Sequence, residues 1–141
     1  MIQYLDTSVL VAAMTAEARS GEIQRWLGQQ DPQTLAISGW VTTEFSAALS
    51  IKLRASQISA QNRAQVLADF ADLCRDSLTL LPINAGHFAI AARIADQHAL
   101  GLRAADALHL AIAFEHGAAI TTLDQRLAEA GPEAGVRTRL L

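Results

Sequence analysis

Short apolar runs and longer helical hydrophobic patterns alternate along the whole chain. The apolar runs predict strands at 2–5, 34–38, 77–82 and 118–122, and residues 136–141 could add an edge strand. Between these runs, apolar side chains recur at every third or fourth position, which predicts helices at 8–14, 17–30, 41–54, 59–75, 84–101, 102–116 and 125–130. Strands that alternate with helices are typical of a parallel sheet covered by helices. We therefore expect an α/β fold, a three-layer α/β/α sandwich around a central parallel sheet of four to five strands.

Turn and capping residues mark several boundaries of these elements. Asn84 and Asp124 each precede a predicted helix and can accept hydrogen bonds from its first N–H groups. Gly117 follows the helix at 102–116, in the position where glycine commonly ends helices. Gly131 and Pro132 are expected to stop the helix at 125–130, because proline has no N–H with which to continue it.

The composition contains a surplus of apolar residues. Of the 141 residues, 51% are hydrophobic and 18% are charged, below the usual charged share of about 25%. Part of the apolar surface should therefore face a partner. The length fits one domain over residues 1–141, since about 100–150 residues is the commonest domain size.

The sequence contains no segment that resembles a membrane anchor or a leader. Charges interrupt the apolar runs well before the roughly 20 residues that a membrane helix needs, and no basic segment followed by an apolar run opens the chain. These features favour a cytoplasmic protein. Cys74 is the only cysteine, so no internal disulfide can form.

Three acidic residues, far apart in the sequence, follow predicted strands or open predicted helices. Asp6 follows the first strand, and Asp124 follows the strand at 118–122. The carboxyl ends of parallel strands share one edge of the sheet, where α/β folds bind ligands, so these two acids should lie near each other. Capping of the following helix is the alternative for both. Glu44 borders the apolar stripe of its helix, although an acid in an early turn also complements the helix dipole.

A fourth acid, Asp106, lies on an apolar helix face. At helical spacing it shares that face with Leu102, His109 and Leu110. A buried carboxylate without a partner is strongly unfavourable. Arg103, three residues earlier, could neutralise Asp106 as an ordinary ion pair. The alternative is a cleft in which Asp106 helps to bind a metal ion.

Four stretches of the sequence together carry a family resemblance. They are Tyr4-Leu5-Asp6-Thr7-Ser8, Glu44 after the second strand, Leu102-Arg103-Ala104-Ala105-Asp106-Ala107-Leu108-His109-Leu110-Ala111, and Thr122-Leu123-Asp124 followed by Arg126-Leu127-Ala128. With these motifs the sequence resembles a PIN-domain ribonuclease, and within that family a VapC-like toxin of a type II toxin–antitoxin pair. The stretch from Arg103 to Ala111 is the most specific of the four.

The resemblance implies a PIN-like fold and a catalytic cluster of acids. The cluster consists of Asp6, Glu44, Asp106 and Asp124, with Thr7 or Ser8 and Thr122 in support. The resemblance also implies Mg²⁺ or Mn²⁺ as cofactor, RNA as substrate and a cognate antitoxin that occludes the site.

The residue types suit this chemistry. Hard divalent ions prefer carboxylate oxygens and promote phosphodiester hydrolysis by activating water and stabilising the leaving oxygen. We expect direct metal binding by Asp6 and Asp106, and direct or water-mediated binding by Glu44 and Asp124. Arg103 could contact phosphate. The net charge of −3 argues against a polyanionic partner, but bound cations would dominate the local field.

The hydroxyl groups and the histidines receive lesser roles. Short hydroxyls suited to orienting a carboxylate or a water belong to Thr7, Ser8 and Thr122. His109 and His116 are seven positions apart with no cysteine cluster, so no zinc site is predicted. We interpret His109 as a helix-face residue with a hydrogen bond.

Two other functions stay open at this point. A phosphotransfer enzyme of the haloacid-dehalogenase type would use Asp6 as nucleophile, but it would need a second acid two residues later, where this chain has Ser8. A catalytically silent PIN-fold module that binds protein or RNA would keep the fold without cleavage.

The partners predicted for the apolar surface are a second copy in a homodimer and the antitoxin. We expect four side chains to contact these partners: Ile23, Trp26, Ile51 and Leu67. The alternative is that these side chains fill the core.

Overall fold

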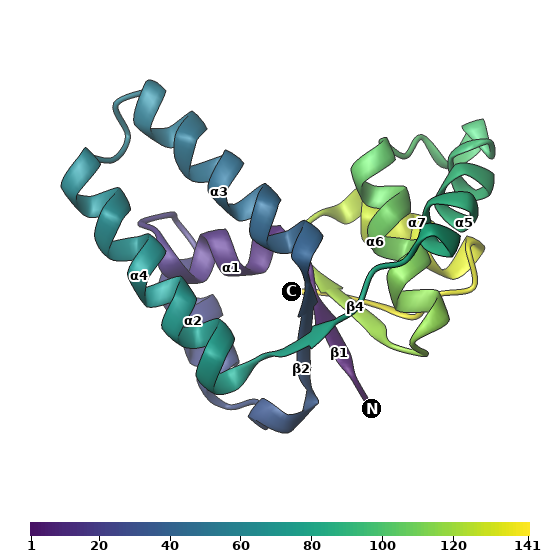
Figure 1. The fold of residues 1–141 in the computed structure, drawn as a ribbon, viewed down its shortest axis with the longest axis horizontal. Coiled ribbons are helices and arrows are strands. Elements are labelled where there is room, and N and C mark those ends of the chain that lie inside the picture. Colours follow the sequence, from purple (N-terminus) through teal and green to yellow (C-terminus); the bar gives the residue numbers. More distant parts are fainter.

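The computed structural model describes residues 1–141 and contains a five-stranded parallel sheet between two groups of helices (Figure 1). The strands are β1 (Gln3–Leu5), β2 (Leu35–Ser38), β3 (Thr79–Leu81), β4 (Ala119–Thr122) and β5 (Thr138–Leu140). Their order in the sheet is β3-β2-β1-β4-β5, and every neighbouring pair is parallel. The predicted fold class is confirmed, including the edge strand near residue 141.

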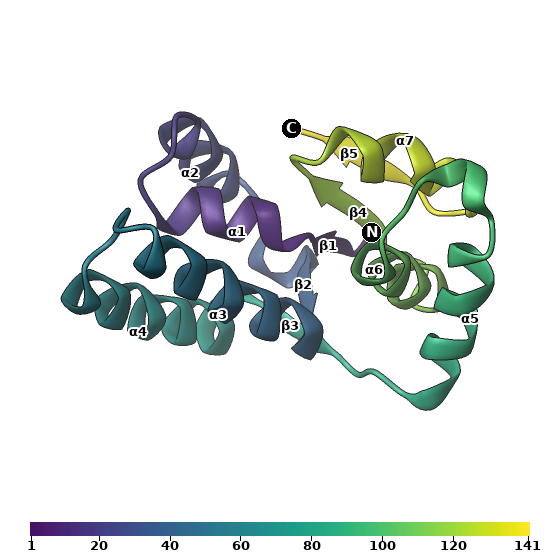
Figure 2. The same cartoon turned by 90° about the horizontal axis from the view of Figure 1, so that it is seen from above.

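Seven α-helices form the two outer layers. One side of the sheet carries α1 (Thr7–Met14), α2 (Ser20–Gly28), α3 (Gly39–Arg54) and α4 (Ala60–Ser77); the other carries α5 (Ala85–Ala95), α6 (Ala104–Glu115) and α7 (Gln125–Glu133) (Figure 1). Two short 3₁₀ turns, η1 (Pro32–Thr34) and η2 (His98–Leu100), complete the chain. Helices α3 and α4 lie side by side in Figure 2, joined by the stacked rings of Phe45 and Phe70, whose centroids are 4.0 Å apart.

Apolar residues of β1 are buried because helices cover both faces of the sheet. Tyr4 and Leu5, which point to opposite faces, are both fully buried. Strand β1 also lies at the centre of the sheet, between β2 and β4. Asp6, the next residue, is therefore held at the middle of the sheet edge formed by the carboxyl ends of the strands.

The helix predicted at 84–101 ends earlier than its sequence suggested. Helix α5 stops at Ala95, and a 3₁₀ turn then leads to Gly101, which has a φ of 63°. The residues that follow Ile94, including Asp96 and Gln97, are exposed. Of residues 95–100 only Leu100 packs against the core, which is too little to hold a further helical turn, and Gly101 can adopt the left-handed conformation that reverses the chain.

The prediction that Gly131 and Pro132 stop the last helix is wrong, since α7 continues to Glu133. Pro132 cannot donate to the carbonyl of Ala128, but the hydroxyl of Thr138 donates to that oxygen at 2.6 Å instead. A Cβ at position 131 would lie only 2.2 Å from Cγ2 of Thr138. Glycine therefore permits the close contact that supplies the missing hydrogen bond.

The residues predicted to form an apolar contact surface differ in exposure. Ile23 is buried in a small cluster with Val9 and Ala12, so it belongs to the core and the prediction of a partner contact is wrong for it. Ile51 is 58% exposed. Trp26 and Leu67 are partly buried. None of the helices combines the length and apolarity needed to cross a lipid bilayer.

Candidate functional site

Asp6 is fixed by two hydroxyl groups at the carboxyl end of β1. Its Oδ2 accepts hydrogen bonds from Ser8 Oγ at 2.6 Å and from Thr122 Oγ1 at 2.9 Å. The side chain makes no capping hydrogen bond to α1, so the capping interpretation of Asp6 does not hold. With Oδ2 occupied by both hydroxyls, Oδ1 faces the ring of His109 at 3.6 Å from Nε2.

The backbone of the loop after β4 orients both hydroxyls. Ser8 Oγ accepts the N–H of Leu123 at 3.0 Å, and Thr122 Oγ1 accepts the N–H of Asp124 at 2.9 Å. Because a carboxylate oxygen can only accept, each hydroxyl donates its hydrogen to Asp6 and uses a lone pair to accept the backbone N–H. Ser8 and Thr122, to which the sequence analysis assigned supporting roles, therefore hold one oxygen of the Asp6 carboxylate in place.

Glu44 reaches the same place from α3. Its Oε1 accepts a hydrogen bond from Thr7 Oγ1 at 2.8 Å and is hydrogen-bonded to His109 Nε2. Partial burial raises the pKa of this carboxyl, but the hydrogen bond and charge of His109 and the hydrogen bond from Thr7 lower it further, so the net pKa lies below the ordinary value. Glu44 is therefore ionised at neutral pH.

His109 is the residue whose position sequence reasoning did not anticipate. Its ring is 1% exposed and lies between Glu44 and Tyr4, with Nδ1 at 2.8 Å from the Tyr4 hydroxyl. The predicted hydrogen bond exists, but the ring lies among the acids rather than on an ordinary helix face. One atom each from Asp6, Glu44 and His109 lie within 4.8 Å of one another, as ligands of one metal ion do. The available signal was that His109 follows Asp106 by one helical turn on α6.

Tyr4 extends this hydrogen-bonded chain into the core. Its hydroxyl lies 2.7 Å from Ser38 Oγ, and both residues are fully buried. Burial raises the pKa of the Tyr4 phenol, the hydrogen bond with Ser38 lowers it, and the charges of Asp6 and Glu44 raise it, so the phenol stays protonated.

Asp106 lies in the first turn of α6 and outside the group formed by Asp6, Glu44 and His109. The charge of Asp6 nevertheless acts on its carboxyl. Partial burial raises the pKa of its carboxyl, a backbone hydrogen bond with Arg103 lowers it, and the charges of Asp124 and Asp6 raise it, with a net upward shift. The side chain of Arg103 is exposed and forms no ion pair with Asp106, so that alternative is not realised. Asp106 is a partly buried carboxylate near other negative charges.

Asp124 caps α7, as the alternative interpretation had it. Its Oδ1 accepts the N–H groups of Arg126 at 2.9 Å and of Leu127 at 3.3 Å. The side chain is exposed and does not join the group of Asp6, Glu44 and His109. Its charge nevertheless reaches Asp106, because it raises the pKa of that carboxyl.

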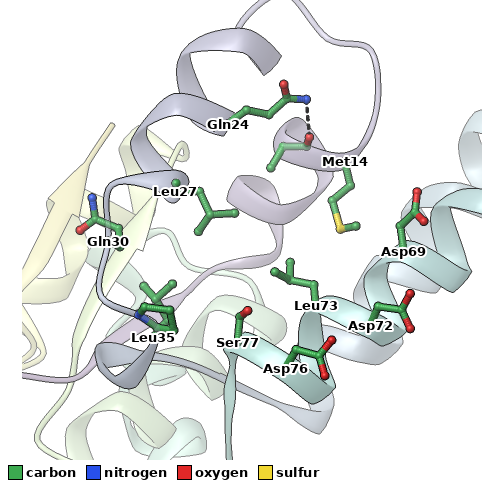
Figure 3. A pocket seen from close by; sticks show the side chains of 13 residues that line it. Met14, Gln24, Leu27, Gln30, Leu35, Asp69, Asp72, Leu73, Asp76 and Ser77 are labelled. Carbon is green, nitrogen blue, oxygen red and sulfur yellow. Dashed lines mark hydrogen bonds between the residues drawn. The ribbon is translucent and has the colours of Figure 1, made fainter.

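A groove elsewhere on the molecule lies away from these acids. It has a volume of about 540 Å³ and lies between α1, α2 and the C-terminal half of α4 (Figure 3). Met14, Leu27 and Leu73 form apolar parts of its wall, and three acids line it along α4, namely Asp69, Asp72 and Asp76. The dashed line in Figure 3 is the hydrogen bond of 2.8 Å from Gln24 Nε2 to the carbonyl of Ala13.

Comparison with protein families identifies one match that covers most of the chain. The model of the PIN domain matches residues 3–132. No curated protein sequence matches.

Several solved structures share the fold at low sequence identity. FitAB bound to an IR36 DNA fragment has a TM-score of 0.75 at 18% identity, covering 99% of this chain and 94% of that one. VapBC2 from Rickettsia felis, bound to a DNA fragment from their promoter, has a TM-score of 0.70 at 15% identity over 100% and 99% of the two chains. PAE2754 from Pyrobaculum aerophilum has a TM-score of 0.67 at 20% identity over 98% and 90%.

Proposed function

The chain belongs to the PIN-domain family, whose members are generally nucleases, and from that premise we propose that it is a metal-dependent endoribonuclease and the toxin of a toxin–antitoxin pair. The observation that supports this proposal most is the convergence of Asp6, Glu44 and His109 at the centre of the sheet edge. In this proposal residues 1–141 form a single PIN-like domain.

The proposed catalytic cluster contains the four acids of the sequence motifs. They are Asp6, Glu44, Asp106 and Asp124. Two observations support the grouping: Asp6 and Glu44 share the ring of His109, and the charges of Asp6 and Asp124 both act on Asp106. Negative groups this close repel one another unless cations lie among them.

The donors fit a hard divalent cation, Mg²⁺ or Mn²⁺. We propose that Asp6 and Asp106 bind it directly and that Glu44 and Asp124 bind it directly or through water. When bound, the ion would supply the Lewis-acid chemistry of phosphodiester hydrolysis. The residues of the chain contribute orientation: Thr7 fixes Glu44, and Ser8 and Thr122 fix Asp6.

We propose RNA as the substrate and Arg103 as a contact for its phosphate. The guanidinium of Arg103 is exposed, has no acidic partner and belongs to the residue that precedes α6, three positions before Asp106. A free guanidinium beside an acidic metal site is well suited to a phosphate oxygen. Because the substrate would be cellular RNA, we propose the cytoplasm as the compartment of this activity.

For the antitoxin, we propose the groove between α2 and α4 as a docking surface. Its apolar wall residues, Leu27 and Leu73 among them, lie beside the acids of α4 (Figure 3). Arg75 pairs with Asp72 and Asp76, but Asp69 has no cationic partner and the acids outnumber the arginine, so the groove suits a segment with both apolar and basic side chains. The solved structures named FitAB and VapBC2, which resemble this chain in fold, are two-component assemblies by name.

For a homodimer, we propose the apolar depression between α3, α5 and α6. Its volume is about 310 Å³, and it is lined only by apolar residues: Trp40, Phe88, Ala91, Ala92, Ala95, Ala104, Ala105, Ala107 and Leu108. Phe88, one of these residues, is 58% exposed, so a second copy could bury it together with the rest of the depression.

Digestion of single-stranded RNA with and without Mg²⁺ or Mn²⁺ tests the enzymatic proposal. Wild-type protein should cleave only with the ion, and Asp6→Asn and Asp106→Asn should abolish cleavage while circular dichroism shows a folded protein. Asp96→Asn is the matched control, since the Asp96 side chain is exposed and makes no hydrogen bond or ion pair. Folded wild-type protein that neither binds Mn²⁺ nor cleaves RNA would instead support the silent binding module. Co-purification with the product of the neighbouring gene tests the antitoxin.

A further inference from the structure

We propose that His109 binds the metal ion directly through Nε2, so that the chain forms a mixed nitrogen–oxygen site that prefers first-row transition-metal ions such as Mn²⁺ over Mg²⁺. The inference rests on the proposed metal-dependent activity and goes further by naming the class of ion. Sequence spacing did not assign His109 to the metal, because no second histidine or cysteine accompanies it.

The separation of the donor atoms fits a shared ion. His109 Nε2 lies 3.6 Å from Asp6 Oδ1. Two ligands that each lie about 2.1 Å from one ion, at an angle of about 90–110°, are themselves about 3.0–3.4 Å apart. The observed separation therefore needs an adjustment of only a few tenths of an ångström. Asp6 Oδ1 is also the oxygen that the hydroxyls of Ser8 and Thr122 leave unused, since both bind Oδ2.

Glu44 can adapt to an ion between itself and His109. Its Oε1 now forms a direct hydrogen bond with Nε2, closer than two ligands of one ion can lie. The glutamate side chain is long and only partly buried, so a rotation of its carboxyl group creates the required space. Thr7 donates to the same Oε1, so its hydroxyl must turn with that oxygen as the carboxyl rotates.

The far side of the imidazole ring has the partner that a metal-binding histidine needs. A ligand histidine carries its hydrogen on the nitrogen that does not bind the metal, and that N–H requires an acceptor. Nδ1 of His109 faces the hydroxyl of Tyr4, which in turn faces Ser38 Oγ. Both hydroxyls can donate or accept, so the hydrogen bonds can run from Ser38 toward His109 or in the reverse direction. When they run from His109 toward Ser38, Nδ1 carries the hydrogen of the ring. Nε2 then presents its lone pair to Asp6 and Glu44.

The donor set determines the class of ion. Mg²⁺ binds oxygen ligands almost exclusively and keeps several waters, whereas imidazole nitrogen binds first-row transition metals well. One imidazole with two carboxylates therefore favours Mn²⁺ over Mg²⁺, and Co²⁺ over Mn²⁺. A cluster of four carboxylates without His109 would not discriminate in this way.

Two measurements on the whole metal-free protein test the inference. Calorimetric titration should show tighter binding of Mn²⁺ than of Mg²⁺, and His109→Gln should lower the Mn²⁺ affinity about 10- to 100-fold while it changes the Mg²⁺ affinity far less. His98→Gln is the matched control, because His98 is exposed and its side chain makes no hydrogen bond. In addition, NMR of wild-type protein labelled with ¹⁵N in histidine and loaded with Co²⁺ should show one strongly shifted imidazole.

The NMR measurement needs no variant, so it decides the question even if His109→Gln does not fold. Wild-type protein that cleaves RNA but binds Mg²⁺ and Mn²⁺ equally, or that shows no shifted imidazole with Co²⁺, overturns this inference alone. Retention of the full Mn²⁺ preference in folded His109→Gln overturns it as well. Absence of both ion binding and cleavage overturns this inference together with the proposed function.

Discussion

Nδ1 of His109 lies 2.8 Å from the hydroxyl of Tyr4, a residue 105 positions earlier in the chain. This contact joins α6 to the central strand β1, and the hydrogen bonds continue to Ser38 at the end of β2 and to Glu44 on α3. Residues of four elements, β1, β2, α3 and α6, thus meet at one line of polar groups, in which Tyr4, Ser38 and His109 are buried and Glu44 is partly buried. The line fixes the geometry of the candidate site from inside the core.

Tyr4→Phe should destabilise the protein although it removes only one oxygen atom. The substitution leaves the buried polar groups of Ser38 and His109 without their shared partner, and such a loss costs about 1–3 kcal/mol in the free energy of unfolding. Urea denaturation in the presence of EDTA measures this cost. Unchanged stability would mean that a water molecule replaces the Tyr4 hydroxyl between Ser38 and His109, and that the line of polar groups is accessible to water.

Thr122→Val should reduce RNA cleavage while the protein stays folded. Valine keeps the branched shape that suits β4, but it removes the hydrogen bond to Asp6 and the acceptor for the N–H of Asp124. Loss of a group that orients a metal ligand typically costs about 10- to 100-fold in activity or metal affinity. Thr121→Val is the matched control, because its hydroxyl makes no hydrogen bond within the chain; equal rates for the two variants would contradict the prediction.

The edge position of the acids could be predicted from the sequence because it follows from connectivity alone. A strand followed by an acid and then a helix repeats at Asp6 and Asp124, and parallel strands bring such positions to one edge. Which of these acids turns toward the site depends on local hydrogen bonds. Asp6 is drawn inward by Ser8 and Thr122, whereas Asp124 turns back to cap α7.

His109 and α7 show what periodicity cannot predict. A histidine on an apolar helix face satisfies the same pattern whether it packs against the core or joins a polar cluster, and only the positions of Tyr4 and Glu44 decide between them. Likewise, proline normally ends a helix, and the continuation of α7 past Pro132 depends on Thr138 of strand β5. Both outcomes depend on contacts between elements that are separate in the sequence.

Asp106→Asn should stabilise the metal-free protein at neutral pH. Burial and the charges of Asp124 and Asp6 raise the pKa of Asp106 in the folded state, despite the opposing backbone hydrogen bond with Arg103. A carboxyl whose pKa is higher in the folded than in the unfolded state opposes folding once it ionises, so stability falls as the pH rises through and above the ordinary carboxyl range. The variant should therefore have the higher melting temperature at pH 7, and the difference should shrink toward pH 4.

Thermal unfolding with EDTA at both pH values measures this difference, with Asp96→Asn as control. A variant that is less stable than wild type at pH 7, or a difference independent of pH, would show that Asp106 stabilises the fold. Asp106→Asn is thus expected to raise stability and to abolish cleavage. Opposite effects on stability and activity are typical of residues kept for activity rather than for folding.

Gly131→Ala should destabilise the C-terminal helix and strand by about 1–3 kcal/mol, as other overpacked sites do. The added methyl group would lie 2.2 Å from Cγ2 of Thr138 and 3.2 Å from the carbonyl oxygen of Val136. Thr138→Ser removes the clashing methyl group and keeps the hydroxyl that donates to Ala128. The double variant should therefore recover part of the lost stability in urea denaturation. Gly28→Ala, where nothing lies within 4 Å, is the control that should cost no stability.

Reversal of charge along α4 should weaken antitoxin binding without affecting RNA cleavage by the free protein. Asp69→Lys combined with Asp76→Lys changes the charge lining the groove by four units and leaves the apolar wall of Met14, Leu27 and Leu73 in place (Figure 3). If a basic segment docks there, association of the purified partners should slow, and added salt, which slows association with wild-type protein, should no longer slow it with the variant because the attraction has become a repulsion. Stopped-flow association at two salt concentrations measures both effects, and Asp96→Lys controls for a general change in charge. Association rates that equal those of wild type at both salt concentrations would place the antitoxin on another face.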